Sequence, residues 1–373
     1  MFFVSAILAT VYFGVIFTYS LSWYKALRKP VVSNDFSRNV SVVIAAKDEE
    51  VHITTLLDCL WQQTVDRHSF EVILVDDHSE DSTRLLAEQW LSWHRDFPLR
   101  ILISPVGQEG KKKALQYAVA HAAGELIAVT DADCLLPPTW IESVRSAFAD
   151  RNLHICCGLT AYTSEKNLFH CLQSLEFLSL VASGMASVAL GHPIMCNGAN
   201  LAYRKASFLA VGGYKSNLST ASGDDIFLLL KMRKKFGKSA IGLYLSADAA
   251  VHTYPTNTLR EFLSQRLRWA GKTPRTHSGD IYFVSLAVFL MSLCLCAVSI
   301  GYCFSASFFP SFISAWGVKL IADYPLIHSV TGVMKKKHLR KYYLPLQIIY
   351  PFYIVAVAGT SLLVRPTWKQ RKI

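Results

Sequence analysis

The sequence lacks the signatures of several common protein classes. Its nine cysteines form no Cys-x-x-Cys pair, and several lie in apolar segments. Reduced thiols used as small apolar side chains, in a cytoplasmic domain, are therefore favoured over a disulfide framework. The Walker spacing Gly-x-x-x-x-Gly-Lys-Ser/Thr is absent. The net charge is +11, but no module of base-stacking aromatics accompanies the basic clusters. We therefore expect anionic headgroups, and no nucleic acid, as their partners.

Charge is missing from the first 23 residues. This stretch is apolar and long enough to cross a bilayer, and it lacks the basic start and the small-residue cleavage site of a signal peptide. Lys25, Arg28 and Lys29 follow it directly. We expect residues 1–24 to form an uncleaved anchor, with the N-terminus outside and the next domain in the cytoplasm, as at a bacterial inner membrane.

Long apolar stretches return near the end of the chain. Ile281–Cys303 is uninterrupted and is predicted to be a transmembrane helix. Phe308–Val330 is a second candidate, although Lys319 and Asp323 inside it would have to face protein, water or each other. A third candidate lies closer to the end of the chain, so we expect two or three membrane segments in residues 281–364.

The third candidate, Tyr343–Val364, contains Pro345 and Pro351, which can kink a helix. Basic residues flank it on both sides, and residues 365–373 form a basic tail that we expect in the cytoplasm. A simple crossing would leave one basic cluster outside. One of the last two segments is therefore expected to be re-entrant or to lie in the membrane interface.

Residues 40–257 alternate short apolar, β-branched runs with amphipathic helical patterns. This alternation predicts a cytoplasmic catalytic domain of the α/β class, with a mostly parallel sheet and helices on both faces. The predicted strands include Val40–Ala46, Phe70–Val75, Arg100–Ser104 and Leu126–Thr130.

Acidic residues follow three of these predicted strands. Ligands of open α/β sheets bind at the carboxyl ends of the strands, so the carboxylates would share one edge. There they would repel each other unless a cation, hydrogen-bond donors or a nucleoside lay among them. Asp131-Ala132-Asp133 can hold a hard divalent cation, although an isolated Asp-x-Asp is more often a solvated loop. The acidic residues are Asp48 and Glu49, Asp76 and Asp77, and Asp131 and Asp133.

Three charged motifs near predicted helix starts each allow two interpretations. The acidic residues 48–50 are either ligands or a favourable helix N-terminus. Gly110-Lys111 is either an anion-binding site or the start of a helix whose lysines face solvent. In Gly223-Asp224-Asp225, before the apolar helix Ile226–Met232, the aspartates are either helix caps or a rigidly held general base.

Two further segments lie between these motifs. Leu168–Leu190 is a long apolar helical pattern interrupted by Gln173 and Glu176. We expect it to be a buried or membrane-facing helix of the catalytic domain and not a span. Asn197–Asn200 then predicts a turn, and Leu201–Tyr203 a short strand.

Residues 258–277 contain an amphipathic helical pattern that we expect to lie in the membrane interface. Gln265 and Arg268 are three residues apart and therefore point the same way, with Trp269 beside them. An alternative is that Trp269 and the arginines only anchor this helix to lipid headgroups.

Together and in this order, the motifs resemble a membrane-bound family 2 glycosyltransferase, of the inverting kind with a GT-A fold. The resemblance covers about residues 41–272 and the flanking membrane segments. Its last motif resembles the Gln-x-x-Arg-Trp signature of ceramide glucosyltransferases and of cellulose and hyaluronan synthases. The motifs are Ala46-Lys47-Asp48-Glu49, Val75-Asp76-Asp77-His78-Ser79, Gly110-Lys111 with Ala114-Leu115, Asp131-Ala132-Asp133, Gly223-Asp224-Asp225 and Gln265-Arg266-Leu267-Arg268-Trp269.

The resemblance implies a site for a nucleotide sugar, such as a UDP-sugar. Glu49 and Asp77 would contact the nucleoside, and Lys111 would contact the nucleoside or the diphosphate. Asp133, supported by Asp131, would hold Mg²⁺ or Mn²⁺ against the diphosphate, where the metal withdraws charge from the leaving group.

The same resemblance implies the catalytic base and the acceptor contact. Asp225 matches the family's base, which deprotonates the acceptor hydroxyl. Asp224 is an alternative, because this chain has Gly-Asp-Asp where the family usually has Glu-Asp or Thr-Glu-Asp. Gln265 and Arg268 would brace the diphosphate, and Trp269 would form the floor of the acceptor site.

The sequence therefore predicts transfer of one sugar to a hydroxyl of a membrane lipid or lipid-linked acceptor at the cytoplasmic face. A processive polysaccharide synthase is an alternative, but the predicted spans are few for extruding a polymer. An inactive nucleotide-sugar-binding membrane protein is a third interpretation. His252 is a candidate further metal ligand, although a lone histidine at a strand end is more often structural.

Overall fold

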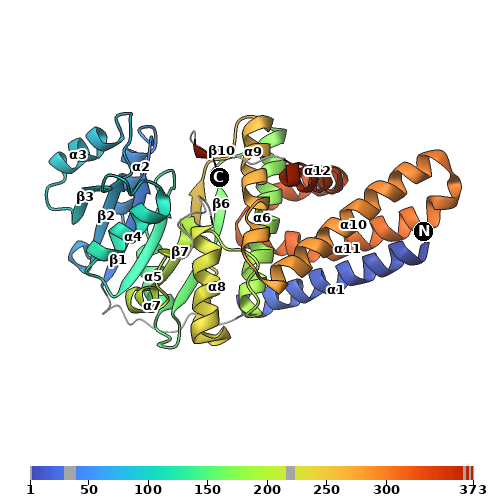
Figure 1. Cartoon of the computed structure of the whole chain (residues 1–373), viewed down its shortest axis with the longest axis horizontal. Coiled ribbons are helices and arrows are strands. Elements are labelled where there is room, and N and C mark those ends of the chain that lie inside the picture. The colour runs from blue at the N-terminus through green and yellow to red at the C-terminus, as the bar shows by residue number, and fades with distance from the viewer. Residues whose placement is uncertain (1, 29–38, 216–222, 364–366, 369–370, 373) are drawn as a thin grey trace. The chain divides into compact units, whose positions relative to one another are not determined.

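The structure, a computed structural model, describes residues 2–28, 39–215, 223–363, 367–368 and 371–372. The chain forms two compact units (Figure 1). The α/β unit comprises Ala26–Thr163 and Met195–Tyr254. The helical unit comprises Met1–Lys25, Ser164–Ile194 and Pro255–Ile373.

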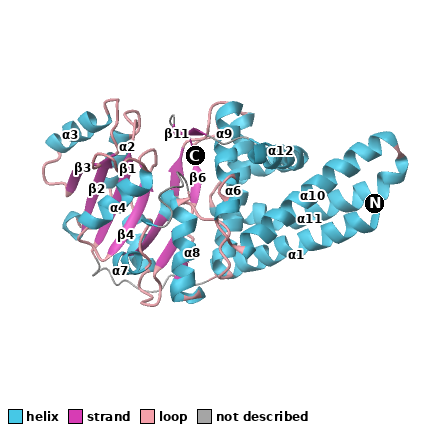
Figure 2. Cartoon of the chain, in the orientation of Figure 1, coloured by secondary structure: helices cyan, strands magenta, loops and turns pink. Residues whose placement is uncertain are grey.

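The α/β unit is built on a sheet of seven strands (Figure 2). They are β1 (Val40–Ala46), β2 (Phe70–Asp76), β3 (Leu99–Ile103), β4 (Leu126–Asp131), β5 (Ile155–Gly158), β7 (Leu201–Arg204) and β8 (Ile241–Tyr244). Their order is β3-β2-β1-β4-β7-β5-β8. All neighbouring strands are parallel except β7, which is antiparallel to β4 and β5. The predicted mostly parallel sheet is confirmed.

In the residues that the structure describes, six α-helices and a second, two-stranded parallel sheet complete the α/β unit. The small sheet pairs β6 (Thr160–Tyr162) with β9 (Val251–Thr253). The helices are α2 (Ile53–Trp61), α3 (Thr83–Trp93), α4 (Lys111–His121), α5 (Trp140–Ala147), α7 (Lys205–Ala210) and α8 (Asp224–Phe236). Short 3-10 turns are η1 (Arg67–Ser69), η2 (Gly198–Asn200), η4 (Lys238–Ala240) and η5 (Ala247–Ala249).

The central strands β1 and β4 are buried on both faces. This burial is typical of parallel strands covered by helices on each side, and it explains their continuous apolar runs. On one face, Val42 and Ile44 of β1 belong to a core that also contains Leu56 of α2 and Trp90 of α3. Each such side chain contributes about 1.5–3 kcal/mol through its burial.

The register of the strands brings the acidic strand ends to one edge of the sheet. Ala46 at the end of β1 pairs with Asp76 of β2, and Ala45 pairs with Asp131 of β4. Because β7 runs antiparallel to β4, its start and the preceding turn η2 lie at the same edge. The predicted common edge is therefore confirmed for the first, second and fourth strands.

The described part of the helical unit contains six α-helices. They are α1 (Phe2–Leu27), α6 (Leu168–Ala189), α9 (Leu259–Ala270), α10 (Gly279–Phe304), α11 (Phe309–Val333) and α12 (Tyr343–Leu363). Short 3-10 turns η6 (Thr273–Arg275), η7 (Ala306–Phe308) and η8 (Lys337–Tyr342) connect them. Figure 1 shows α1, α10 and α11 side by side, and they share a core that includes Tyr12, Leu295 and Ala315.

Four helical segments of the described residues are long and apolar enough to cross a membrane, by length and composition only. They are Phe2–Leu27, Leu168–Ala189, Gly279–Phe304 and Lys337–Ser361. Pro351 lies inside α12 without ending it. The re-entrant or interfacial placement of one late segment stays a prediction, and the predicted basic tail lies mostly outside the described residues.

The grouping of α6 differs from the sequence-based prediction. The expected helix is present, but it belongs to the helical unit and not to the catalytic domain. It packs against α11, α12 and η8, and most of its apolar stretch is buried. A helix that is apolar around most of its circumference needs neighbours on several sides, and the helical unit supplies them.

Lys319 and Asp323, the charged residues of α11, pair with each other. Lys319 Nζ lies 2.6 Å from Asp323 Oδ2, and Lys319 also donates to Gln347 of α12. The hydroxyl of Tyr12 in α1 donates to Asp323 Oδ1 at 2.7 Å. The expectation that these charges face protein or each other is confirmed, and the ion pair joins three helices.

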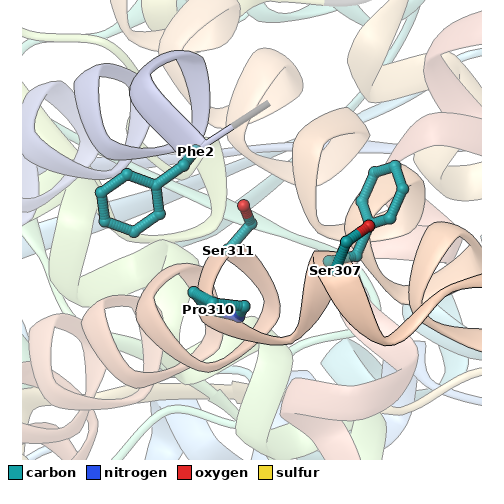
Figure 3. A pocket seen from close by; sticks show the side chains of 5 residues that line it. Phe2, Ser307, Pro310 and Ser311 are labelled. Atoms are coloured by element: carbon teal, nitrogen blue, oxygen red, sulfur yellow. The ribbon is translucent and has the colours of Figure 1, made fainter.

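A cavity of about 440 Å³ lies at the starts of α1 and α11 (Figure 3). Phe2, Ser307, Phe308, Pro310 and Ser311 line it. None of these residues is charged, so the cavity offers apolar surface and hydroxyls but no groups suited to holding a diphosphate.

Candidate active site

Lys111 connects the acidic end of β4 with the start of α8. Its Nζ lies 2.5 Å from Asp131 Oδ1 and 3.5 Å from Asp224 Oδ2. Lys111 is the first residue of α4, so the β3–α4 connection delivers it to the edge where β4 ends. The three predicted site residues are thus brought together, although Asp131 and Asp224 are far apart in the sequence.

Gly198 allows the turn η2 to approach this cluster closely. A Cβ at Gly198 would lie 3.2 Å from Asp224 Oδ2 and 3.8 Å from Lys111 Nζ. The sequence predicted only a turn here. No local signal indicated that its glycine would lie against charged groups, because that proximity arises from the antiparallel pairing of β7 with β4.

Asn200 fixes the turn that carries Gly198. Its side chain is fully buried, and its Nδ2 donates to the carbonyls of Leu159 at 2.7 Å and Ala249 at 3.1 Å. Its Oδ1 accepts from the indole of Trp140 and from the hydroxyl of Tyr244. This amide satisfies both its donors and its acceptor, so it orders the strand ends around η2.

Asp133 lies two residues beyond Asp131, beside β9. The Thr253 hydroxyl donates weakly to Asp133 Oδ2 at 3.4 Å. Leu135 and His252 exchange backbone hydrogen bonds of 2.7 and 3.0 Å, which holds β9 against this segment. The backbone of His252 is therefore close to the segment that follows Asp133. The role of His252 as a metal ligand stays a prediction.

The loops after β1 and β2 are joined by reciprocal hydrogen bonds. The amide of Asp48 donates to the Ser79 hydroxyl at 3.1 Å, and the amide of Glu80 donates to Asp48 Oδ1 at 2.9 Å. The amide of Glu49 donates to the Thr83 hydroxyl at 2.7 Å. These bonds hold Asp48 and the following residue at the sheet edge.

The interpretation of residues 48–50 as a helix N-terminus is wrong. Helix α2 begins at Ile53, and its first turn contains no acidic residue. The Glu49 carbonyl accepts from the amides of His52 and Ile53, both at 3.0 Å. The acidic residues thus form a turn before the helix, because their side chains and amides bond across to the β2 loop instead.

Asp77 is buried and holds the start of α4. Both oxygens of its carboxylate accept from the amide of Gly110 at 2.9 Å. Gly110 has a φ of 114°, a conformation that residues with a Cβ rarely adopt. Asp77 therefore fixes the turn that aims Lys111, and the Gly110 amide is occupied by a carboxylate of the protein.

Asp224 and Asp225 occupy the first turn of α8 and are both buried. Asp225 Oδ1 accepts from the amide of Ile226 at 2.7 Å. Gly223, in the left-handed conformation with a φ of 86°, precedes them without a side-chain cap. The predicted helix start is confirmed, and acidic residues suit the positive end of its dipole.

The electrostatics of the cluster leave an excess of negative charge. Loss of solvation raises the pKa of Asp131, and Asp133 adds to this rise, whereas Lys111 opposes it. Burial lowers the pKa of Lys111, but the attraction of Asp131 and Asp224 outweighs that effect and raises it. One lysine thus faces several carboxylates, and a further cation would relieve the remaining repulsion.

This donor set fits a hard divalent cation that has additional ligands from outside the protein. Among the residues that the structure describes, no three histidine, cysteine, aspartate or glutamate side chains are arranged to hold a metal ion. Carboxylate oxygens such as those of Asp131 and Asp133 are nevertheless the ligands that Mg²⁺ and Mn²⁺ prefer. Ligand oxygens or water would have to complete the coordination.

Gln265, Arg268 and Trp269 lie on α9 of the helical unit. The predicted amphipathic helix is present, and Thr258 and Glu261 form a capping box at its start. The buried residues of α9 are Phe262 and Arg266, so only a narrow face of this helix is buried. The roles of Gln265, Arg268 and Trp269 stay predictions.

Replacing Lys111 by methionine should destabilise the protein in a pH-dependent way. At neutral pH we expect a loss of about 1–3 kcal/mol, between the values for exposed and buried ion pairs. Without the lysine, the pKa of Asp131 in the folded protein rises further above its value in the unfolded chain. Protonation of Asp131 then relieves the repulsion between the carboxylates. The loss of stability is therefore complete above the raised pKa of Asp131 and becomes smaller as the pH falls through that pKa.

Thermal unfolding of detergent-solubilised protein between neutral pH and about pH 5 measures this difference. Lys113→Met is the matched control, because Lys113 Nζ donates to the Gly107 carbonyl at 3.1 Å. A deficit for Lys111→Met that does not change with pH would contradict the proposed charge cluster.

Comparisons with known proteins identify the α/β unit. Residues 41–212 match the model of the family "Glycosyl transferase family 2". Glycosyltransferase AglE of Haloferax volcanii is 28% identical over 124 residues, which are 33% of this chain and 40% of that protein. Dolichyl-phosphate beta-glucosyltransferase of Mus musculus is 25% identical over 150 residues, 37% of this chain and 46% of that protein. The chain thus spans less than half the length of both relatives.

A solved structure shows the same fold along nearly the whole chain. Mannosyltransferase PcManGT from Pyrobaculum calidifontis, in complex with GDP-Man and Mn²⁺, has a TM-score of 0.61 and 20% sequence identity. The likeness covers 96% of this chain and 97% of that one. With a mostly parallel sheet and the match of residues 41–212, the chain carries a family 2 glycosyl transferase domain of the GT-A fold.

Proposed function

We propose that the protein is an inverting glycosyltransferase that moves one sugar from a nucleotide diphosphate sugar to a hydroxyl of a membrane lipid or lipid-linked acceptor. The observation that supports it most is the cluster of Asp131, Lys111 and Asp224 at the carboxyl edge of the sheet. This cluster contains a lysine that can bind a phosphate. It also contains carboxylates that can bind a metal ion or act as a base. The family match and the fold support the same reaction class.

The donor site would be formed by the loops after β1, β2 and β4. Glu49 and Asp77 would contact the nucleoside, and Lys111 would place positive charge on the diphosphate. Asp133 and Asp131 would hold Mg²⁺ or Mn²⁺, and the metal ion would neutralise negative charge on the leaving diphosphate. The Pyrobaculum calidifontis structure, which contains GDP-Man and Mn²⁺, supports a nucleotide sugar and a divalent cation in this role.

Asp225 would act as the general base. It would take the proton of the acceptor hydroxyl while the acceptor oxygen bonds to the anomeric carbon. The bond to the diphosphate oxygen breaks with its electron pair, and a single displacement inverts the configuration. Asp224 is held at 3.5 Å by Lys111. This contact supports Asp224 as the residue that orients the lysine and Asp225 as the base.

The acceptor would come from the membrane. The mouse relative is named for dolichyl phosphate, and the described residues of the helical unit include four segments long and apolar enough to cross a bilayer. Trp269 on α9 would form the acceptor floor, and Gln265 and Arg268 would brace the diphosphate. Lys25 in the last turn of α1 and Arg28 directly after the helix support a cytoplasmic site.

Transfer from labelled donors tests this function. Purified protein is incubated with radiolabelled UDP- and GDP-sugars, Mn²⁺ and extracted membrane lipids, and the products are separated by chromatography. We expect a labelled product that migrates as a glycolipid. A polymer of high mass would indicate a processive synthase instead, and binding without transfer would indicate an inactive nucleotide-sugar-binding protein.

Substitution of Asp133 tests the metal. Asp133→Ala removes an oxygen ligand, so we expect transfer to fall by on the order of 100-fold or more and its dependence on Mn²⁺ to weaken. Asp96→Ala is the control, because Asp96 is an exposed carboxylate that contacts Arg67 at 3.3 Å. Full, metal-dependent activity of Asp133→Ala would exclude this residue as a ligand.

Substitution of the two aspartates in α8 tests the base. Asp225→Asn keeps the shape of the side chain but removes its basicity, so we expect turnover to fall by about 10²–10⁴-fold with donor binding retained. Asp224→Asn should mainly weaken donor binding through Lys111. Turnover of both variants and their affinity for the nucleoside diphosphate distinguish the roles. The opposite result would move the base to Asp224.

A further inference from the structure

A buried ion pair connects α6 and α9 inside the helical unit. The guanidinium of Arg266 donates through Nε to Glu176 Oε1 at 3.2 Å and through Nη2 to Glu176 Oε2. The two side chains are 3% and 4% exposed. This is a two-pronged contact between a planar donor and a carboxylate, which fixes the orientation of the guanidinium as well as its position.

The third nitrogen of the guanidinium orients Gln265. Nη1 of Arg266 donates to Gln265 Oε1. An arginine can only donate hydrogen bonds, so the carbonyl oxygen of the glutamine amide must face it. The Nε2 group of Gln265, which carries two donor hydrogens, is therefore turned away from Arg266. This is the orientation in which a glutamine can donate to an anion such as a diphosphate.

The same guanidinium also lies over two aromatic rings. Its carbon lies 4.3 Å from the centre of the Trp269 ring and 4.4 Å from that of Phe262. These residues lie three positions after and four positions before Arg266, on one face of α9. Phe177 of α6 lies next to the Trp269 ring at 6.0 Å between centroids. The indole thus lies close to both Arg266 and Phe177.

Packing alone does not account for this pair. Two charges buried together lose their hydration, and a pair of apolar side chains of similar size often stabilises a protein as well or better. The ion pair also fixes the orientation of neighbouring side chains, because the planar guanidinium of Arg266 contacts Glu176, Gln265 and Trp269 at the same time.

We propose that Glu176 and Arg266 are positioning residues, which hold Gln265 and Trp269 in the orientations needed for the diphosphate and the acceptor. The proposal rests on the proposed function for the roles of Gln265 and Trp269. Glu176 acts through Arg266, and Arg266 acts through its two neighbours on α9. Neither needs to touch a substrate.

Arg266→Lys tests the proposal with a conservative change. Lysine keeps the positive charge beside Glu176 but has no planar fork, so it cannot also direct the Gln265 oxygen and support the indole. We expect kcat to fall on the order of 100-fold, as for a small misplacement of reacting groups, with little change in the thermal unfolding temperature. An unchanged kcat would overturn the proposal.

Exchange of the two residues separates positioning from stability. In the double variant Glu176→Arg with Arg266→Glu the ion pair can form again. The carboxylate at position 266 can only accept hydrogen bonds, so it turns the Nε2 of Gln265 toward itself. We expect a folded protein with low kcat. Recovery of kcat to within about twofold of the unsubstituted protein, too small a change to reflect a lost orientation, would show that the pair is only structural.

Glu165→Gln is the matched control in the helical unit. Glu165 is also a buried carboxylate, and it contacts Lys336 at 2.5 Å without bonding to α9 in the described pairs. Its substitution should lower the unfolding temperature and leave kcat unchanged. A kcat loss equal to that of Arg266→Lys would mean that any lost ion pair disturbs the unit, which would also overturn the proposal.

A spectroscopic measurement distinguishes failure of the proposal from failure of the proposed function. Protein labelled with 5-fluorotryptophan gives a ¹⁹F signal for Trp269, assigned through its loss in Trp269→Phe. We expect this signal to shift or broaden in Arg266→Lys and in the exchanged variant, but not in Glu165→Gln. If the unsubstituted protein transfers no sugar, the proposed function fails and this signal alone decides the positioning. A signal that does not change would overturn it.

Discussion

Repulsion between carboxylates is the constraint on which the candidate site depends. Three loops bring acidic residues to one edge of the sheet, and the register of β1 with β2 and β4 makes this unavoidable. Lys111 offsets part of the charge by contacting Asp131 and Asp224. Asp77 stabilises the same arrangement indirectly, because it holds the Gly110 amide and thus the turn that aims the lysine. A site with this surplus of negative charge is prepared to receive a cation together with an anionic ligand.

The sequence was sufficient for the features that depend on local pattern. Apolar β-branched runs predicted the first strands of the sheet, and their acidic ends predicted a common edge. The charges inside α11 were predicted to face protein, water or each other, because an isolated ion is too costly in an apolar helix. The apolar helical pattern after Asp224 and Asp225 predicted a helix start at these residues, because aspartate is a common N-terminal cap.

Features that depend on distant contacts were not predictable. Nothing near Gly198 or Asn200 indicates that an antiparallel strand brings their turn beside Lys111. The apolar pattern of α6 shows that it is buried, but not whether the sheet or the other helices bury it. Residues 48–50 would suit a helix start, yet side-chain and amide bonds to the loop after β2 hold them outside α2. In each case a partner far away in the sequence decides the outcome.

The contact between Tyr12 and Asp323 also has a consequence for biosynthesis. These residues are 311 positions apart, so α1 leaves the ribosome long before α11 can provide its carboxylate. The intervening chain includes the whole α/β unit, which has its own core and can fold in the meantime. The first helix therefore has to form without its partner on α11. The helical unit closes only when the last quarter of the protein has been made.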